Sequence, residues 1–143
     1  MKIGELANAA KCTTETIRFY EKTGLLPEAE RTASNYRNYG LVHVERLRFI
    51  RNCRMLDMTH EEIRALLGLV AQPDEDCTAI NELLDEHIEH VSVRINQLER
   101  LRQQLVALRV TCSQARLVGA CGIVKGLAEM AIDPTPTAHT HLG

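Results

Sequence analysis

The chain has 143 residues and a mass of 16.1 kDa, which leaves room for one compact domain, or a small domain with an extended appendage, and excludes a large multidomain enzyme. Apolar residues make up 45% and aromatic residues only 3%, a composition that favours helices around an aliphatic core. The net charge of −2 conceals an asymmetry: residues 1–60 carry ten Lys and Arg against seven Asp and Glu, whereas the later residues carry seven against twelve. The basic N-terminal part predicts an anionic partner.

No stretch approaches the ~20 consecutive apolar residues of a membrane helix, and the N-terminus lacks the apolar core of a signal peptide. We therefore expect a cytoplasmic protein with no membrane partner. Five cysteines are an odd number, and cytoplasmic thiols stay reduced. Metal ligation or burial is expected for these residues, rather than disulfides.

Two short helices joined by a turn are predicted at the N-terminus. Thr13 or Thr14 suits the start of the second helix, and Gly24 suits a left-handed residue after its end. This pattern indicates a helix-turn-helix. The polar run from Glu28 to Asn38 is rich in turn formers and predicts a small β-wing.

A second helix-turn-helix follows the wing. Apolar residues recur at helical spacing between residues 42 and 56, and Thr59 with Glu62 three positions later forms a capping box before another apolar run. Pro73 ends that helix and begins a linker.

The next segment carries a coiled-coil stripe, with apolar residues at steps of three and four. Its members are Leu84, Ile88, Val91, Ile95, Leu98, Leu101, Leu105, Leu108 and Cys112. Little chain remains to cover such a seam except a second copy of itself. We therefore expect an antiparallel homodimer.

These elements predict a mainly α fold: a winged helix-turn-helix DNA-binding domain, a long antiparallel coiled-coil dimerisation helix and a C-terminal metal-binding loop. The expected ranges are 1–70 for the DNA-binding domain, 71–78 for a linker, 79–112 for the dimerisation helix, 113–130 for the loop with a short helix, and 131–143 for a flexible His-containing tail.

Double-stranded DNA is the anionic partner that this organisation favours. The second helix offers hydroxyl and guanidinium donors for bases and phosphates, and the wing offers groups that clamp phosphates. The candidate contacts are Thr14, Thr16, Arg18 and Tyr20 on the helix and Arg31, Asn35, Tyr36 and Arg37 in the wing. The alternative interpretation is a solvated polar face.

Three cysteines are candidate metal ligands: Cys77 before the long helix, Cys112 at its end and Cys121 after a short loop. A continuous helix keeps the first two ~50 Å apart, so one chain cannot bring them to the same ion. In an antiparallel dimer, the partner's Cys77 completes each of two equivalent sites. Three thiolates favour a soft cation, with zinc remaining open although it usually takes four ligands. Burial is expected instead for Cys12 and Cys53.

Several segments together resemble the MerR family of transcriptional regulators: Ile3-Gly-Glu-Leu-Ala7, Thr16-Ile-Arg-Phe-Tyr-Glu21, Gly24-Leu-Leu-Pro27, Asn35-Tyr-Arg37 and Arg46-Leu-Arg-Phe-Ile50. The resemblance covers nearly the whole chain. It implies a regulator that sits on an over-long promoter spacer and, on binding its effector, distorts the DNA so that RNA polymerase engages both promoter elements. Deformation of the duplex would then be the switch.

The same resemblance bears on the metal. A Cys at position 77 is similar to the branch that senses divalent metals, and the segment from Cys112 to Ile123 looks most like lead-responsive regulators. It implies Pb(II) or Cd(II) as effector, with Hg(II) or Zn(II) as alternatives. Auxiliary imidazole ligands are a further option, with solvated side chains as the alternative: His87, His90, His139 and His141. His43 and His60 are expected at the surface.

Two other classes fit less well. An enzyme with a Cys nucleophile lacks a supporting motif, since no Gly-rich phosphate loop, HExxH or local Cys-protease signature occurs in the chain. A metal-sequestering protein shares the thiolates but has no need for basic helices or a wing.

Overall fold

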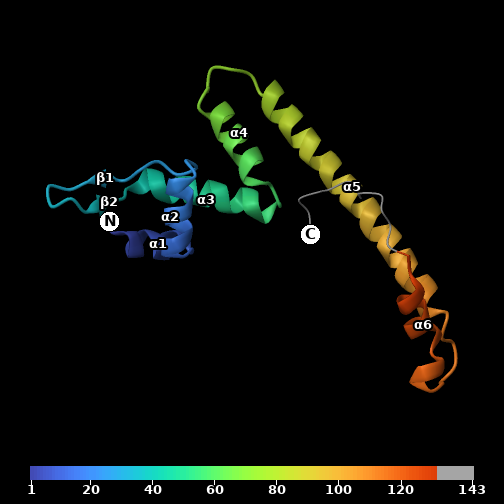
Figure 1. Ribbon diagram of the computed structural model, residues 1–143. Coiled ribbons are helices and arrows are strands. Elements are labelled where there is room, and N and C mark those ends of the chain that lie inside the picture. The colour runs from blue at the N-terminus through green and yellow to red at the C-terminus, as the bar shows by residue number, and fades with distance from the viewer. Residues whose placement is uncertain (132–143) are drawn as a thin grey trace. The chain divides into compact units, whose positions relative to one another are not determined.

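A computed structural model describes residues 1–131 of the chain. The elements, in order, are α1 (Ile3–Ala10), α2 (Thr14–Lys22), β1 (Glu30–Arg31), β2 (Arg37–Asn38), α3 (Leu41–Met55), α4 (His60–Val70), α5 (Thr78–Arg109), the 3-10 helix η1 (Val118–Ala120) and α6 (Gly122–Glu129) (Figure 1). The chain divides into two compact units: the first unit ends at Leu83, and the second unit begins at Leu84. No helix within residues 1–131 has the length and apolar character needed to cross a membrane. The predicted mainly α architecture, with a two-stranded wing and a long helix, is confirmed.

The first helix-turn-helix comprises α1 and α2. Thr13 caps α2, because its hydroxyl oxygen accepts a hydrogen bond from the Thr16 amide at 3.1 Å. Gly24 follows the end of α2 with φ +80°, a left-handed conformation that glycine adopts without steric cost. Both features match the predicted start and end of this helix.

The wing is an antiparallel hairpin in which Glu30 pairs with Asn38 and Arg31 pairs with Arg37. Its turn places Asn35 at φ 64°, a left-handed position that Asn tolerates better than most residues. The Asn35 amide donates to the Thr32 carbonyl at 2.8 Å. The polar run therefore folds as expected, into a short hairpin whose strand residues are all exposed.

The second helix-turn-helix comprises α3 and α4. The capping box is present in full: the Glu62 amide donates to the Thr59 hydroxyl at 3.0 Å, and the Thr59 amide donates to the Glu62 carboxylate at 2.9 Å. An arginine on α4 also reaches the end of α2, where Arg64 donates to the Thr23 carbonyl at 2.6 Å. The two helix-turn-helix units are thus joined by a charge-assisted bond between residues far apart in sequence.

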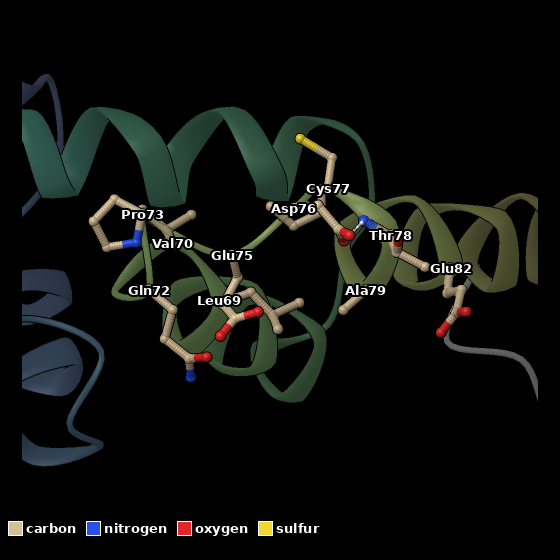
Figure 2. A pocket seen from close by; sticks show the side chains of 11 residues that line it. Leu69, Val70, Gln72, Pro73, Glu75, Asp76, Cys77, Thr78, Ala79 and Glu82 are labelled. Carbon is tan, nitrogen blue, oxygen red and sulfur yellow. Dashed lines mark hydrogen bonds between the residues drawn. The ribbon is translucent and has the colours of Figure 1, made fainter.

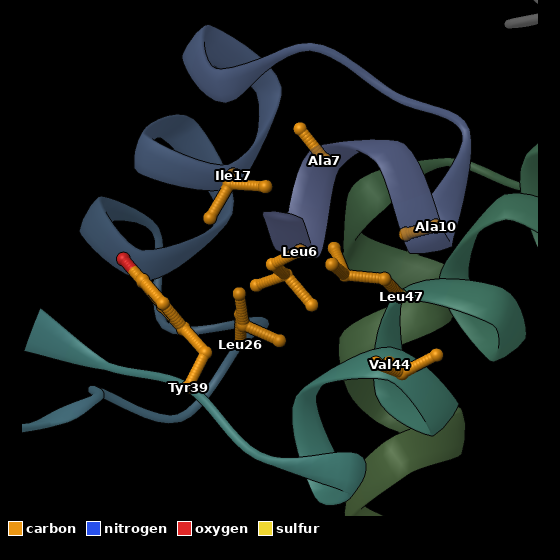
Figure 3. Packing of buried hydrophobic residues seen from close by; sticks show 8 residues of the cluster. All are labelled: Leu6, Ala7, Ala10, Ile17, Leu26, Tyr39, Val44 and Leu47. Atoms are coloured by element: carbon orange, nitrogen blue, oxygen red, sulfur yellow. The ribbon is translucent and has the colours of Figure 1, made fainter. Parts of the chain in front are cut away.

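Aliphatic side chains form the core of the first unit, in two clusters. The first gathers residues from α1, α2, α3 and the segments on either side of the wing, and comprises Leu6, Ala7, Ala10, Ile17, Leu26, Tyr39, Val44 and Leu47 (Figure 3). The second comprises Leu25, Ile50, Cys53, Met58 and Ile63. Each large aliphatic side chain among them contributes roughly 1.5–3 kcal/mol by leaving water. The predicted burial of Cys53 is confirmed, at 7% exposure.

One prediction about this unit is wrong. His43, expected at the surface, is only 5% exposed. Its Nδ1 accepts a hydrogen bond from the Gly40 amide at 3.0 Å, and its ring meets that of Tyr39 edge to face at 5.2 Å. The imidazole therefore closes the start of α3 and packs on the strand that precedes it. The predicted surface position of His60 holds only in part, because that side chain is half-buried.

The helix α5 is continuous over 32 residues, which corresponds to ~48 Å. In the single chain the apolar stripe along it lies exposed, with Ile88 at 55%, Ile95 at 59% and Leu105 at 58%. Monomeric proteins rarely leave so long an apolar surface in water. The stripe is therefore an apolar surface on which another protein surface is expected to pack.

Replacing Tyr39 with Phe tests the wing anchor. The Tyr39 hydroxyl donates to the Glu21 carboxylate, and burial together with this carboxylate raises the pKa of Tyr39 to about 12. Because this pKa lies above the ordinary tyrosine value of 10.0, stability from the bond is complete below pH 10 and is lost as the pH rises towards 12. We expect the phenylalanine variant to unfold at lower urea concentration at neutral pH, and the difference in free energy of unfolding to shrink over this alkaline range. A difference that stays constant up to pH 12 would contradict this account.

Candidate nucleic-acid interface and metal centre

Five of the eight predicted DNA contacts line one hollow of about 360 Å³ in the first unit. They are Arg18, Arg31, Asn35, Tyr36 and Arg37, joined there by Lys2 and Ile3. Four cationic side chains around a single hollow form a local positive surface of the kind that attracts a nucleic-acid backbone. The structure therefore unites α2 and the wing in one basic surface.

Lys2 is a member of this surface that sequence reasoning missed. It precedes α1 and donates its amide to the Glu5 carboxylate at 2.7 Å. The start of a helix carries a partial positive charge from its free amides, which favours a neighbouring anion. An isolated lysine at position 2 carries no periodic signal, so only the fold reveals that it lies beside Arg18.

The wing residues differ in exposure and support. The guanidinium of Arg31 donates to the Asn35 carbonyl at 3.1 Å, which ties the strand to the turn. Tyr36 at the wing tip is 71% exposed and offers both a ring and a hydroxyl to a ligand. The wing therefore presents its polar groups on a turn that is held by its own hydrogen bonds.

The other three predicted contacts lie outside this hollow. Thr14 begins α2, and the hydroxyl of Thr16 is 2.8 Å from that of Thr13. Tyr20 is half-buried, packs on both core clusters and meets the His60 ring edge to face at 5.8 Å. Burial raises the pKa of Tyr20, so its hydroxyl stays protonated. Contact with DNA stays a prediction for all eight residues.

Cys77 immediately precedes α5 and is exposed at a hollow of about 380 Å³ lined by residues 69–82 (Figure 2). Asp76 fixes the backbone there, because its carboxylate accepts the Thr78 amide at 3.0 Å. This bond lowers the pKa of Asp76. The thiol of Cys77 is therefore held at the start of a helix and remains open to an approaching ligand.

Cys112 and Cys121 lie together in the second unit. Cys121 occupies the N-cap position of α6, and its pKa is lowered by the nearby amides of Val124 and Ile123 and then by the thiol of Cys112. Cys112 is tied in turn by Arg109, which donates to its carbonyl at 2.8 Å. A helix N-terminus with a neighbouring guanidinium is the setting that turns a thiol into a thiolate ligand.

A close backbone approach places Cys121 beside Cys112. A Cβ at Gly122 would lie 2.3 Å from the Thr111 carbonyl oxygen, and one at Gly126 would lie 2.9 Å from Leu108 Cδ1. The two glycines therefore let α6 pack directly on the last turn of α5. Sequence reasoning gave these residues no role, although the four-residue interval between them was visible.

The remaining cysteines and histidines are distributed differently. Burial raises the pKa values of Cys12 and Cys53, which disfavours their thiolates. His87 is 4% exposed, and its ring lies 6.4 Å from that of His90. Solvent exposure, one of the two expectations for this pair, is therefore wrong for His87. The predicted auxiliary ligands His139 and His141 lie outside the described residues.

A basic hollow between a helix-turn-helix and its wing defines the class as a winged helix-turn-helix DNA-binding protein. Residues 1–69 match the family described as "MerR HTH family regulatory protein", and residues 44–108 match "MerR, DNA binding". The ZntR homolog of Haemophilus influenzae, an HTH-type transcriptional regulator, is 49% identical over 109 residues, covering 76% of this chain and 81% of that protein. The chain belongs to the MerR family of transcriptional regulators.

Two further similarities concern metals. The crystal structure of PbrR691 from Ralstonia metallidurans CH34, in complex with lead(II), superposes with a TM-score of 0.82 at 46% identity, covering 89% of this chain and 98% of that chain. The mercuric resistance operon regulatory protein of Bacillus cereus is 36% identical over 126 residues, covering 88% of this chain and 96% of that protein. The similar proteins are thus transcription regulators associated with more than one heavy metal.

Replacing Lys2 with Gln tests the interface. Removing one ammonium group from the hollow is expected to weaken DNA binding and to lower the slope of log affinity against log salt by about one. The measurement is fluorescence anisotropy at several salt concentrations, with a duplex selected by the native protein from a random pool. Lys125→Gln, in α6, removes the same charge elsewhere and is expected to keep the native slope. An unchanged slope in Lys2→Gln would remove this lysine from the interface.

Proposed function

We propose that this protein binds promoter DNA as a homodimer and activates heavy-metal resistance genes when Pb(II) or Cd(II) binds to three cysteines. The observation that carries the proposal is the pair of adjacent thiols, Cys112 and Cys121, at the N-terminus of α6. The similarity to the lead(II) complex of PbrR691 supports the choice of metal. The basic hollow supports DNA as the site of action.

The donor set fits a soft metal ion. Sulfur ligands select thiophilic cations over Mg²⁺ or Ca²⁺, and a bound ion supplies a positive centre that holds three thiolates together. Cys121 enters the site with a lowered pKa, so it gives up its proton more readily than an ordinary cysteine. Burial raises the pKa values of Cys12 and Cys53, which leaves those two thiols poorly suited as ligands.

The third ligand is supplied by the partner subunit. Within one chain, α5 runs without a break between Cys77 and Cys112, so these two thiols cannot meet. The exposed apolar stripe of α5 is the surface on which a second copy packs. An antiparallel arrangement brings the partner's Cys77 to Cys112 and Cys121, and symmetry then generates two sites.

Metal binding acts on DNA by favouring one of two dimer geometries. Fixing the loop between Cys112 and Cys121 to the other subunit stabilises the geometry in which the two DNA-binding units bend and untwist an over-long promoter spacer. RNA polymerase then engages both promoter elements. Protein–phosphate contacts such as those of Arg18 and Arg31 offset the cost of deforming the duplex.

The identity of the metal is tested by competition. The reduced, anaerobic dimer is titrated with Pb(II), Cd(II), Hg(II) and Zn(II) against chelators, while thiolate-to-metal charge-transfer absorption is recorded. We expect two Pb(II) or two Cd(II) ions per dimer, bound well ahead of Zn(II), because the site offers three sulfurs. A preference for Zn(II), or for Hg(II) over both expected metals, would replace the assigned effector. No binding of any of them would overturn the three-cysteine site.

A mixed dimer tests the shared site. Cys77→Ser and the double variant Cys112→Ser/Cys121→Ser are each expected to lose the charge-transfer band, since every site lacks a ligand. Their heterodimer retains one complete site, made from Cys77 of one chain and Cys112 with Cys121 of the other. When the two variants are unfolded and refolded together, random pairing makes about half of the dimers heterodimers. We therefore expect about half of the native signal from the isolated heterodimer and about a quarter from the refolded mixture. No recovered signal in a verified heterodimer would show that the ligands do not come from two chains.

A buried cysteine provides the matched control. Cys53→Ser changes the same atom as the other variants but lies in the second core cluster. It is expected to keep the full charge-transfer signal, with some loss of stability from a polar group in the core. A lost signal in this folded control would indicate that Cys53 takes part in binding.

A further inference from the structure

A single buried carboxylate lies between α2 and the wing. Glu21, in the last turn of α2, has a side chain only 8% exposed. It accepts a hydrogen bond from the Tyr39 hydroxyl, and its Oε2 is 3.6 Å from Nη1 of Arg37. Both partners come from β2 or the residue that directly follows it. The carboxylate is therefore bound by two residues at the end of the wing, Arg37 and Tyr39, which lie 16 and 18 positions after it in the sequence.

The alternation of side chains along a strand explains why these two partners meet the same carboxylate. Arg37 and Tyr39 are two positions apart, so they project to one side of the extended chain, and Asn38 between them projects to the other. A buried carboxylate is costly unless it is paired and hydrogen-bonded. Glu21 satisfies that requirement with one hydroxyl and one guanidinium from the same face of the strand.

Arg37 has a second environment. Its side chain is 41% exposed and lines the basic hollow together with Lys2, Arg18 and Arg31. A guanidinium carries five N–H donors in a fixed plane, so pairing with one carboxylate leaves donors for a phosphate on the other side. The long side chain of an arginine is otherwise free to adopt many rotamers, and restricting it beforehand lowers the entropic cost of binding.

We propose that Glu21 is a positioning residue of the DNA interface, which holds the Arg37 guanidinium in the basic hollow so that it meets a backbone phosphate. Glu21 does not touch the DNA. Tyr39 anchors the carboxylate from the core side, and Arg37 makes the contact. The role of Glu21 concerns the DNA-binding unit alone. It rests on DNA binding, and it can be tested independently of the assigned metal ligands.

The decisive variants are Glu21→Gln, Arg37→Gln and their combination. Glutamine keeps the size of the side chain and an oxygen that accepts the Tyr39 hydroxyl, but it removes the charge that holds Arg37. Affinity for the selected duplex is measured by anisotropy as a function of salt. Each single variant is expected to lower the salt slope by about one and the affinity by roughly five- to tenfold near 0.1–0.2 M salt, the effect of one phosphate contact. The double variant is expected to match Arg37→Gln alone.

Two controls separate positioning from folding and from charge. Glu30→Gln removes a negative charge from the exposed strand β1 and is expected to leave the slope unchanged. Val44→Ala removes two methyl groups from the first core cluster and lowers stability, while Glu21, Arg37 and Tyr39 remain in place. Its salt slope is therefore expected to stay native although its melting temperature falls.

Four results would overturn the proposal. A native slope in Glu21→Gln would show that Arg37 does not need the carboxylate, and tighter binding in this variant would show that Glu21 only repels phosphate. Additive losses in the double variant would show that the two residues act independently. If Val44→Ala lowered the slope as much as Glu21→Gln, the effect would follow from stability rather than from the position of Arg37.

Discussion

The length of α5 is the constraint on which the rest of the molecule depends. A continuous helix of 32 residues keeps Cys77 away from Cys112, while Cys112 and Cys121 remain adjacent beyond its end. The same helix carries an apolar stripe that the single chain leaves in water. The element that prevents one chain from assembling the three thiols therefore also offers the surface on which the second chain of the proposed dimer would pack. In the proposed dimer, metal affinity and subunit association are linked, because each site forms only in the assembled protein.

The DNA-binding unit depends instead on a small core, which brings many polar and charged side chains into one surface. Two aliphatic clusters position α1, α2, the wing and the second helix-turn-helix, and charged side chains then tie the ends of these elements together. Arg64 bonds to the end of α2, Arg31 closes the wing turn, and Glu21 joins α2 to β2. Rigidity at these junctions fixes the distances between cationic groups, and those distances must match the regular spacing of phosphates on a duplex.

The sequence predicts the elements of this fold well, because their signals are local. The threonine caps, the capping box at Thr59, the left-handed Gly24 and the polar hairpin all depend on residues within a few positions of one another. The residues that were missed depend on contacts between distant segments. Lys2 becomes part of the hollow only when α1 meets the wing, His43 is buried by its own helix start and by Tyr39, and Glu21 finds its partners on another element. Periodicity and capping rules consider only residues close together in sequence, so they do not predict contacts between distant segments.

The close packing of α6 on the end of α5 limits how the proposed metal site could be redesigned. Gly122 has no room for a side chain, since a Cβ there would lie 2.3 Å from the Thr111 carbonyl oxygen. Any other residue there would push α6 away and separate the two thiols, whatever its chemistry. Residues 113–120, by contrast, are all exposed in the single chain, so their side chains can change with little cost to packing within it. New ligands or a new loop length are therefore best introduced in that segment, with the Cys121-Gly122 peptide left as the fixed point around which selectivity is varied.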